Sequence, residues 1–352
     1  MTVTPAVPGS DIKLGLSLYS LTSEWAAGRY DLAGLLDAVD RAGIGPGIEI
    51  VASQTIRTYP EVTDEFVRAW RGAFDRHGFA PSSFGANLDM GRRRDRDMTP
   101  DEEYEFTATQ FRSAKALGFP LVRIQSAKPA LIRRLLPLAE ELDLVLGYEI
   151  HAPKGPNTPD VLEVREVYEQ IGSPRLGFVA DLSSTMHSMS PTLLRTLSRM
   201  GLGAADLARL QAIWAKDTGI NERHAEFVEY LESRGIAPAG LGPFARLAFN
   251  MHGHVDPKEW ADIMPQIVHV HAKFYDIDEN GDEPAIDYPA IVRQLVAGGY
   301  SGYMSSEWEG HAFADLDEAD PIDLIAKQHD LIRRAIRDSL ADLGVVVGTN
   351  RA

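Results

Sequence analysis

The sequence contains no cysteine. This absence excludes disulfide bonds, zinc sites built from thiolates and cysteine nucleophiles. A metal ion bound by this chain must therefore be held by oxygen and imidazole ligands. The sequence offers these through 51 aspartates and glutamates and 10 histidines.

Positive charge is also scarce, with 35 lysines and arginines and a formal net charge of −16. An acidic surface repels phosphate backbones and anionic lipid head groups, so we expect neither nucleic acid nor a membrane as partner. No stretch approaches the roughly 20 apolar residues of a membrane helix. The opening residues, MTVTPAVPGSD, lack the pattern of a signal peptide. We therefore expect a cytoplasmic enzyme.

Short apolar segments alternate along the chain with segments of helical period. The expected strands cover residues 12–20, 47–53, 81–89, 120–126, 144–152, 175–184, 267–276 and 302–310. The expected helices cover residues 31–43, 61–78, 99–118, 129–142, 158–172, 288–299 and 320–340. This alternation predicts an α/β fold, a parallel (β/α)8 TIM barrel. An open doubly wound sheet is the alternative, but no glycine fingerprint follows the first strand.

The long stretch between the sixth and seventh expected strands breaks the regular spacing. Residues 185–262 hold further segments of helical period, which predict a helical insertion that serves as a lid or as a partner-binding segment. We expect residues 1–345 to form one barrel domain and residues 346–352 to form a tail.

Ionisable residues recur at the ends of the last four expected strands. In "LVLGYEIH", "RLGFVADL", "VHVHAKF" and "GYMSSEWEG", alternation turns the acidic residues and the histidines toward the barrel interior. Barrel enzymes carry their chemistry at these strand ends. Three carboxylates packed together would repel one another without a cation. We therefore expect a divalent metal, Mn²⁺ first and Mg²⁺, Co²⁺ or Zn²⁺ as alternatives, on Glu149, Asp181, His271 and Glu307.

A single inward glutamate or histidine is more often a structural hydrogen-bonding group, so the metal hypothesis depends on finding four at one level. We expect His269 to lie one layer deeper than His271, in a structural role. Arg123 and Gln125 share one face of the fourth strand and are candidate substrate contacts, although a barrel-filling arginine is more common. His254 lies in an expected loop and is a candidate for either a substrate contact or a surface residue.

The stretches "YEIH" (148–151), "VHVHAKFYDID" (268–278) and "SSEWEGH" (305–311) resemble the sugar isomerase/epimerase superfamily with the xylose-isomerase-like barrel. Within it they are most similar to the catalytic α subunits of C-glycoside deglycosidases, which work with a small β subunit. The resemblance implies the same metal set, a hetero-oligomer and cleavage of 3-oxo-C-glycosides. Ser184 and Ile277 stand where ketose 3-epimerases commonly have a histidine and an arginine, which argues against a free-ketose epimerase.

The resemblance implies a carbon–carbon lyase. Removal of the acidic C2 proton of a 3-oxo sugar would give an enolate, which a metal can stabilise and which can expel the aglycone by β-elimination. We expect His151 to be the general base, since an ordinary imidazole accepts a proton near pH 7. Lys273 is a candidate electrophile or substrate clamp, and Glu309 and His311 are candidates to orient the ligands or supply an acid. A metal-dependent sugar or inositol-derivative isomerase or epimerase is the alternative, and a non-catalytic barrel subunit is a third hypothesis.

Overall fold

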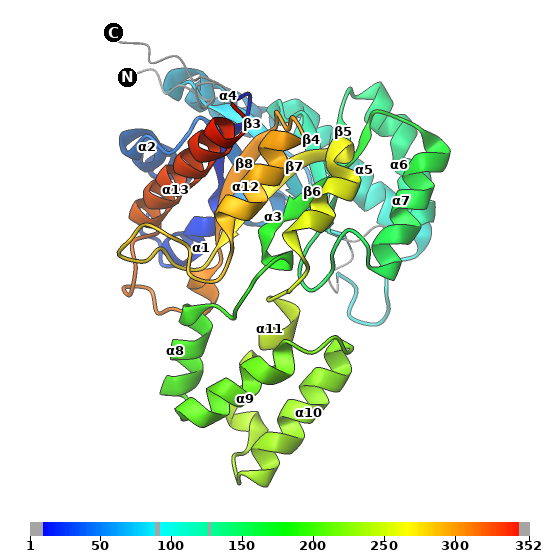
Figure 1. The fold of residues 1–352 in the computed structure, drawn as a ribbon. Coiled ribbons are helices and arrows are strands. Elements are labelled where there is room, and N and C mark those ends of the chain that lie inside the picture. The colour runs from blue at the N-terminus through cyan, green and yellow to red at the C-terminus, as the bar shows by residue number, and fades with distance from the viewer. Residues whose placement is uncertain (1–9, 89–91, 126–127, 345–352) are drawn as a thin grey trace.

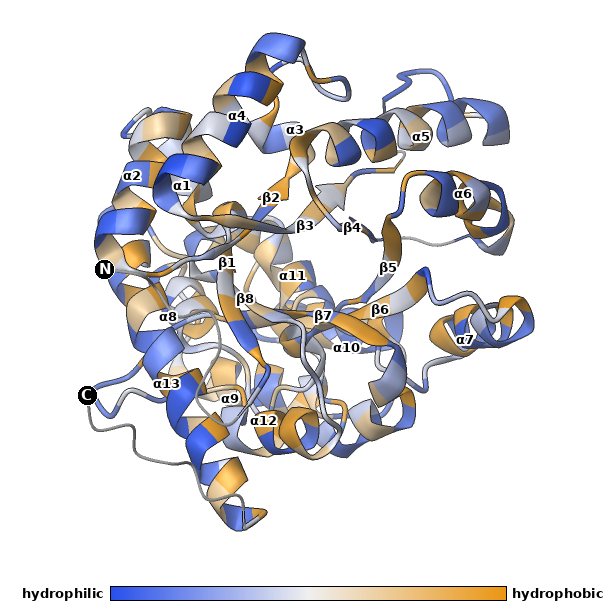
Figure 2. Cartoon of the chain, turned by 90° about the horizontal axis from the view of Figure 1, so that it is seen from above, coloured by the Kyte–Doolittle hydropathy of each residue, from blue (hydrophilic) through white to orange (hydrophobic). Residues whose placement is uncertain are grey.

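A computed structural model describes residues 10–88, 92–125 and 128–344. Eight parallel strands close into a barrel in the order of the sequence, and helices surround them (Figures 1 and 2). The prediction of a TIM barrel is confirmed. The expected tail, residues 346–352, lies outside the described residues.

Each expected strand overlaps an observed one, and the observed strands are shorter. They are β1 Lys13–Ser17, β2 Gly47–Val51, β3 Ala80–Ala86, β4 Leu121–Ile124, β5 Val145–Ile150, β6 Leu176–Asp181, β7 Ile267–Phe274 and β8 Tyr303–Trp308.

The helices that follow these strands form the outer ring, with apolar faces against the strands (Figure 2). They are α1 Thr22–Ala26, α2 Leu32–Ala42, α3 Ala52–Thr55, α4 Asp64–His77, α5 Pro100–Leu117, α6 Pro129–Glu141, α7 Pro159–Ile171, α12 Tyr288–Ala297 and α13 Pro321–Asp342. No helix among the described residues is long and apolar enough to cross a membrane.

Local signals in the sequence explain where these helices begin and end. The hydroxyl of Thr99 accepts a hydrogen bond from the backbone N–H of Glu102, whose carboxylate accepts one from the backbone N–H of Thr99 in return. This capping box starts α5. Gly43 ends α2 at a φ of 66°, a conformation that costs glycine little.

The chain between β6 and β7 carries four further helices, which gather at one end of the barrel (Figure 1). They are α8 Pro191–Arg199, α9 Ala204–Trp214, α10 Ile220–Ser233 and α11 Phe244–Asn250. Short 3-10 turns complete the fold: η1 Leu18–Leu21, η2 Leu182–Ser184, η3 Pro238–Leu241, η4 Pro257–Gln266 and η5 Gly310–Ala312. Whether the helices between β6 and β7 act as a lid or as a partner surface stays a prediction.

The register of the last strands brings polar side chains to one level. Asp181 of β6 pairs with His271 of β7, and Lys273 of β7 pairs with Glu307 of β8. Since the strands are parallel, their C-terminal ends meet at the same mouth of the barrel. The fold therefore concentrates these ionisable groups in one place.

Candidate active site and metal centre

The four predicted ligands converge inside the barrel mouth. Each offers a nitrogen or oxygen atom within 4.8 Å of the corresponding atoms of the others, and all four residues are buried. The Nδ1 atom of His271 lies 2.6 Å from Oε1 of Glu149, 3.3 Å from Oε2 of Glu307 and 3.6 Å from Oδ2 of Asp181. The structure thus brings together the set that the strand ends predicted.

The hydrogen bonding of this cluster is incomplete in a way that fits a cation. Nδ1 of His271, Oε2 of Glu149, Oδ2 of Asp181 and Oε2 of Glu307 are buried without a hydrogen-bond partner. Buried polar atoms are normally satisfied. Of these four, Oε2 of Glu307 has an ion-pair contact with Nζ of Lys273 at 2.9 Å, and the bonding capacity that stays unmet needs an explanation. Three carboxylate oxygens and one imidazole nitrogen match the ligand preferences of Mn²⁺, Mg²⁺, Co²⁺ and Zn²⁺. The residues present therefore fit a divalent cation.

The pKa shifts of the clustered side chains support the same conclusion. Burial alone would lower the pKa of His271, but the carboxylates of Glu307, Glu49 and Glu149 raise it well above its usual range. Burial, against weaker opposing attractions, raises the pKa of Glu307. The crowded negative charge thus draws either protons or a metal into the cluster, and a metal would replace the protons.

Lys273 lies beside the cluster as a buried ammonium group. Its Nζ is 2.6 Å from Oε2 of Glu309, 2.9 Å from Oε2 of Glu307 and 3.4 Å from Oδ2 of Asp181. Burial would lower the pKa of Lys273, but the carboxylates of Asp181, Glu307 and Glu309 raise it well above its usual range. Lys273 is therefore a fixed positive charge and not a base.

Glu309 follows the end of β8 and holds this ammonium in place. Burial would raise the pKa of Glu309, yet the ammonium of Lys273 holds it below its usual range. The second carboxylate oxygen accepts a hydrogen bond of 2.9 Å from the hydroxyl of Tyr19. Glu309 is thus an ionised acceptor, which fits the predicted orienting role better than the acid role.

His151 lies just beyond β5, at the mouth. Its Nδ1 is 2.8 Å from the carbonyl oxygen of Ala152, and its Nε2 is 3.9 Å from Oδ2 of Asp181. A carbonyl oxygen only accepts hydrogen bonds, so the proton of the neutral ring sits on Nδ1 and the lone pair of Nε2 is free. The side chain is 26% exposed. It is therefore accessible from the cavity.

A cavity of about 440 Å³ opens above the cluster. Its lining residues are Tyr19, Val51, Ser53, Gln54, Asn87, Arg123, Gln125, Glu149, His151, Ala152, Lys154, Met251, Lys273, Glu307 and Glu309. The predicted substrate contacts Arg123 and Gln125 are both in this wall. Nη1 of Arg123 is also 3.6 Å from Oε2 of Glu149, so the guanidinium neutralises part of the cluster's charge.

Two predicted site residues are not in this wall. The ring of His311 is packed edge-on against Tyr19, at 4.7 Å between centroids, and burial lowers the pKa of His311. It is therefore a neutral ring behind Tyr19 and poorly suited to act as an acid. Nε2 of His254 lies 3.5 Å from the carboxylate of Asp217, and the ring of His254 meets Trp214. The structure does not bring His254 to the cavity.

Two residues of this region were not predicted from the sequence. Tyr19, just after β1, lines the cavity and binds Glu309. Glu49 of β2 is fully buried, and its carboxylate accepts hydrogen bonds from both His269 and His271. A lone acidic residue in the apolar run "GIEIV" was the available signal, of the same kind as the histidines in β7.

The sequence model of one protein family, "Xylose isomerase-like TIM barrel", matches residues 36–335. The C-glycoside deglycosidase alpha subunit of Arthrobacter globiformis is 62% identical over 96% of each chain. The 3'-dehydrocarminate deglycosidase alpha subunit of a Microbacterium species is 40% identical over 95% of this chain and 98% of its own.

A solved L-ribulose 3-epimerase structure shares the fold with a TM-score of 0.56 and 12% identity, over 96% of this chain and 99% of that one. At this identity the likeness concerns the fold alone. The family match and the two bacterial relatives go further. This chain belongs to the xylose isomerase-like TIM barrel family, on the branch that includes the C-glycoside deglycosidase alpha subunits.

Proposed function

We propose that this chain is the catalytic subunit of a metal-dependent C-glycoside deglycosidase, a carbon–carbon lyase that cleaves 3-oxo-C-glycosides. The observation that carries this proposal is the convergence of Glu149, Asp181, His271 and Glu307 below a cavity that also presents a base and a fixed cation. The names of the relatives support the same substrate class.

The four clustered residues would hold the metal, for which we propose Mn²⁺. When bound there, a divalent cation supplies Lewis acidity that stabilises negative charge on the oxygen of an enolate. Arg123 would balance part of the negative charge of Glu149, from which its Nη1 is 3.6 Å away.

We assign the first proton transfer to Nε2 of His151. The C2–H bond of the 3-oxo sugar breaks, the proton goes to this nitrogen, and the electron pair forms the enolate across C2 and C3. The hydrogen bond from Nδ1 to the carbonyl oxygen of Ala152 holds the ring in the tautomer that can accept the proton, and it stabilises the imidazolium that forms. The imidazolium also lies near the negative charge of Asp181, at 3.9 Å.

Lys273 would act as an electrostatic clamp. Its ammonium lines the cavity and cannot move freely, because Glu309 and Glu307 hold it at 2.6 and 2.9 Å. A preorganised positive charge stabilises an oxyanion without reorganisation during the reaction. The hydroxyl of Tyr19 fixes the other oxygen of Glu309 and so keeps this clamp in place.

Collapse of the enolate restores the C3 carbonyl, forms a double bond between C1 and C2 and breaks the bond from C1 to the aglycone carbon. That carbon leaves with the electron pair and needs a proton, which the imidazolium of His151 can return. The 1,2-unsaturated sugar then adds water. The ring of His151 is thereby restored to its starting state, and no oxidant or reductant is consumed.

The relatives are named alpha subunits, which implies a partner subunit for them. We propose that this chain likewise works in a hetero-oligomer with a small β subunit. The helices α8–α11 at one end of the barrel are the surface we propose for a lid or for this partner (Figure 1). A cytoplasmic location stays a prediction.

The test uses the purified protein, stripped of metal and reloaded with Mn²⁺, with and without a candidate β subunit. A 3-oxo-C-glucoside of a flavonoid is incubated in D₂O, chromatography follows the aglycone and NMR follows the proton at C2. Metal-dependent release of the aglycone is the expected result. Exchange at C2 or an epimer without release would replace the lyase by the isomerase or epimerase. If neither release nor exchange is detected while metal is bound, the proposed substrate class is refuted.

A further inference from the structure

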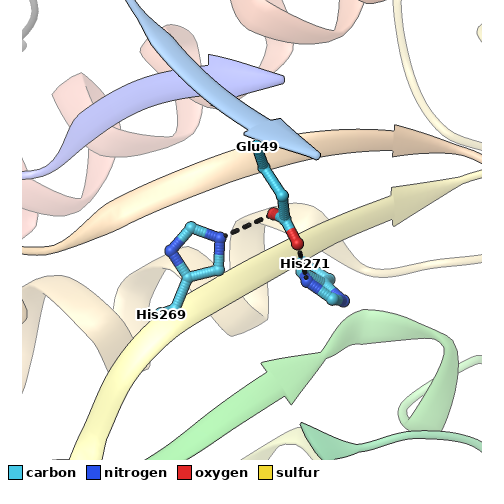
Figure 3. Close-up of side chains that lie close together, drawn as sticks. All are labelled: Glu49, His269 and His271. Carbon is cyan, nitrogen blue, oxygen red and sulfur yellow. Dashed lines mark hydrogen bonds and ion pairs between the residues drawn. The ribbon is translucent and has the colours of Figure 1, made fainter. Parts of the chain in front are cut away.

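A single carboxylate reaches across the barrel interior to the metal-site strand. Oε1 of Glu49 lies 2.8 Å from Nε2 of His271, and Oε2 lies 2.9 Å from Nε2 of His269 (Figure 3). Glu49 is on β2 and both histidines are on β7, which is not a neighbour of β2 in the barrel. All three side chains are buried.

The donor and acceptor roles in this trio are fixed by chemistry. Each Nε2 lies at hydrogen-bond distance from a different oxygen of Glu49, which is the arrangement in which one carboxylate accepts from two imidazole N–H groups. An ionised carboxylate only accepts hydrogen bonds, so both Nε2 atoms must carry protons. In a neutral imidazole the other nitrogen then has a free lone pair.

In the neutral ring of His271, the form that binds a metal, that lone pair belongs to Nδ1, which points at the cluster. Nδ1 is the atom that lies 2.6 Å from Glu149 and 3.3 Å from Glu307, and it has no hydrogen-bond partner. Glu49 thus touches the opposite side of the ring from the side that faces the cluster. Its contact can set both the tautomer of the ring and its orientation.

We propose that Glu49 is a positioning residue that commits His271 to bind the metal through Nδ1. The inference rests on the metal centre of the proposed function and concerns a residue that would not touch the metal or the substrate. Outer carboxylate partners of metal-binding histidines typically change metal affinity by about 10–100-fold.

A second metal site at Glu49, His269 and His271 fits the geometry less well. Each Nε2 faces a different carboxylate oxygen at a hydrogen-bond distance, and neither Nε2 lacks a partner. The two rings also stand at 89° to each other, with 5.6 Å between centroids. Glu49 therefore bridges the two rings, with one carboxylate oxygen on each. His269 would therefore act by holding Glu49, one step further from the metal.

The test compares metal binding by the wild type, Glu49→Gln and Glu49→Leu. Leucine keeps the approximate size and removes both acceptors. Glutamine keeps one neutral acceptor oxygen, so it rescues part of the contact. Glu103→Gln is the matched control, because Glu103 is another buried glutamate, on α5, whose partner is Lys128 and not the cluster. Mn²⁺ affinity is measured by calorimetric titration of the stripped, folded proteins.

We expect Glu49→Leu to weaken Mn²⁺ binding by about 10–100-fold, Glu49→Gln to weaken it less, and Glu103→Gln to leave it unchanged. If Glu49→Leu binds Mn²⁺ with wild-type affinity, this inference is overturned but the proposed metal centre is not. A wild type that binds no divalent ion would overturn the metal centre and this inference with it.

A second measurement does not depend on the folding of a variant. Nitrogen NMR of the ¹⁵N-histidine-labelled wild type, loaded with diamagnetic Zn²⁺, reports which ring nitrogen of His271 carries the proton. A proton on Nε2 with Nδ1 bound to metal is the expected result. A proton on Nδ1, or on both nitrogens, would overturn the proposal.

Discussion

Replacing His151 by alanine removes the imidazole to which we assign proton transfer. General acid–base catalysis contributes about 10²–10⁴-fold, so kcat should fall by this factor, or about 3–5 kcal/mol in the activation barrier. The metal should stay bound, because His151 is not one of the four clustered residues and its Nε2 is 3.9 Å from Oδ2 of Asp181. The fold should tolerate the change, since the side chain is partly exposed and makes one hydrogen bond, to the carbonyl of the next residue.

The assay measures three quantities on the same protein: aglycone release, deuterium uptake at C2 and Mn²⁺ affinity. His224→Ala is the matched control, because this histidine lies on α10 and packs against Phe249, away from the residues that line the cavity. We expect His151→Ala to lose release and exchange together at unchanged Mn²⁺ affinity. Turnover within tenfold of the wild type would refute the base assignment, and a large loss of metal affinity would show that His151 is a ligand instead.

Three further predictions follow. Asp181→Asn should weaken Mn²⁺ binding by about 100-fold or more, since a direct ligand should matter more than an outer partner; calorimetric titration that gives wild-type affinity would exclude Asp181 as a ligand. Lys273→Met leaves the buried carboxylate of Glu309 without its 2.6 Å partner, which should cost about 3–5 kcal/mol. At about 2.1 cal/mol/K per residue this lowers the Tm by ~4–7 °C, and the double variant with Glu309→Gln should recover much of the loss; an unchanged Tm would contradict the pairing. Burial lowers the pKa of His329 to about 4, so the unfolded chain binds the proton first as the pH falls below about 6.5. The free energy of unfolding should therefore be ~2 kcal/mol lower at pH 5 than above that pH. Urea unfolding of His329→Gln should lack this part of the loss. An identical pH profile in the variant would contradict the prediction.

The barrel could be predicted from the sequence because strand alternation and helical period are local signals. The convergence of Glu149, Asp181, His271 and Glu307 was predictable for a related reason. Once the strands are parallel and consecutive, the ends of β5–β8 must lie side by side, so residues far apart in the sequence fall at one level.

The parts that could not be predicted depend on contacts between distant segments. Glu49 approaches His271 across the barrel, and no local pattern says which inward residues of non-neighbouring strands meet. His254 lies in a segment between helices, and the path of this segment is set by tertiary packing. There His254 contacts Asp217 and does not line the cavity. His311 follows the last strand but turns behind Tyr19, because the chain enters a 3-10 turn after Glu309.

The most direct test of the account is a titration of Mn²⁺ into the stripped protein in which bound metal and aglycone release are measured together. We predict that release from a 3-oxo-C-glycoside rises in proportion to bound metal and saturates at about one ion per chain, because the four clustered residues form a single candidate site. Full activity in the stripped protein, or one bound ion per chain without any release of aglycone, would contradict it.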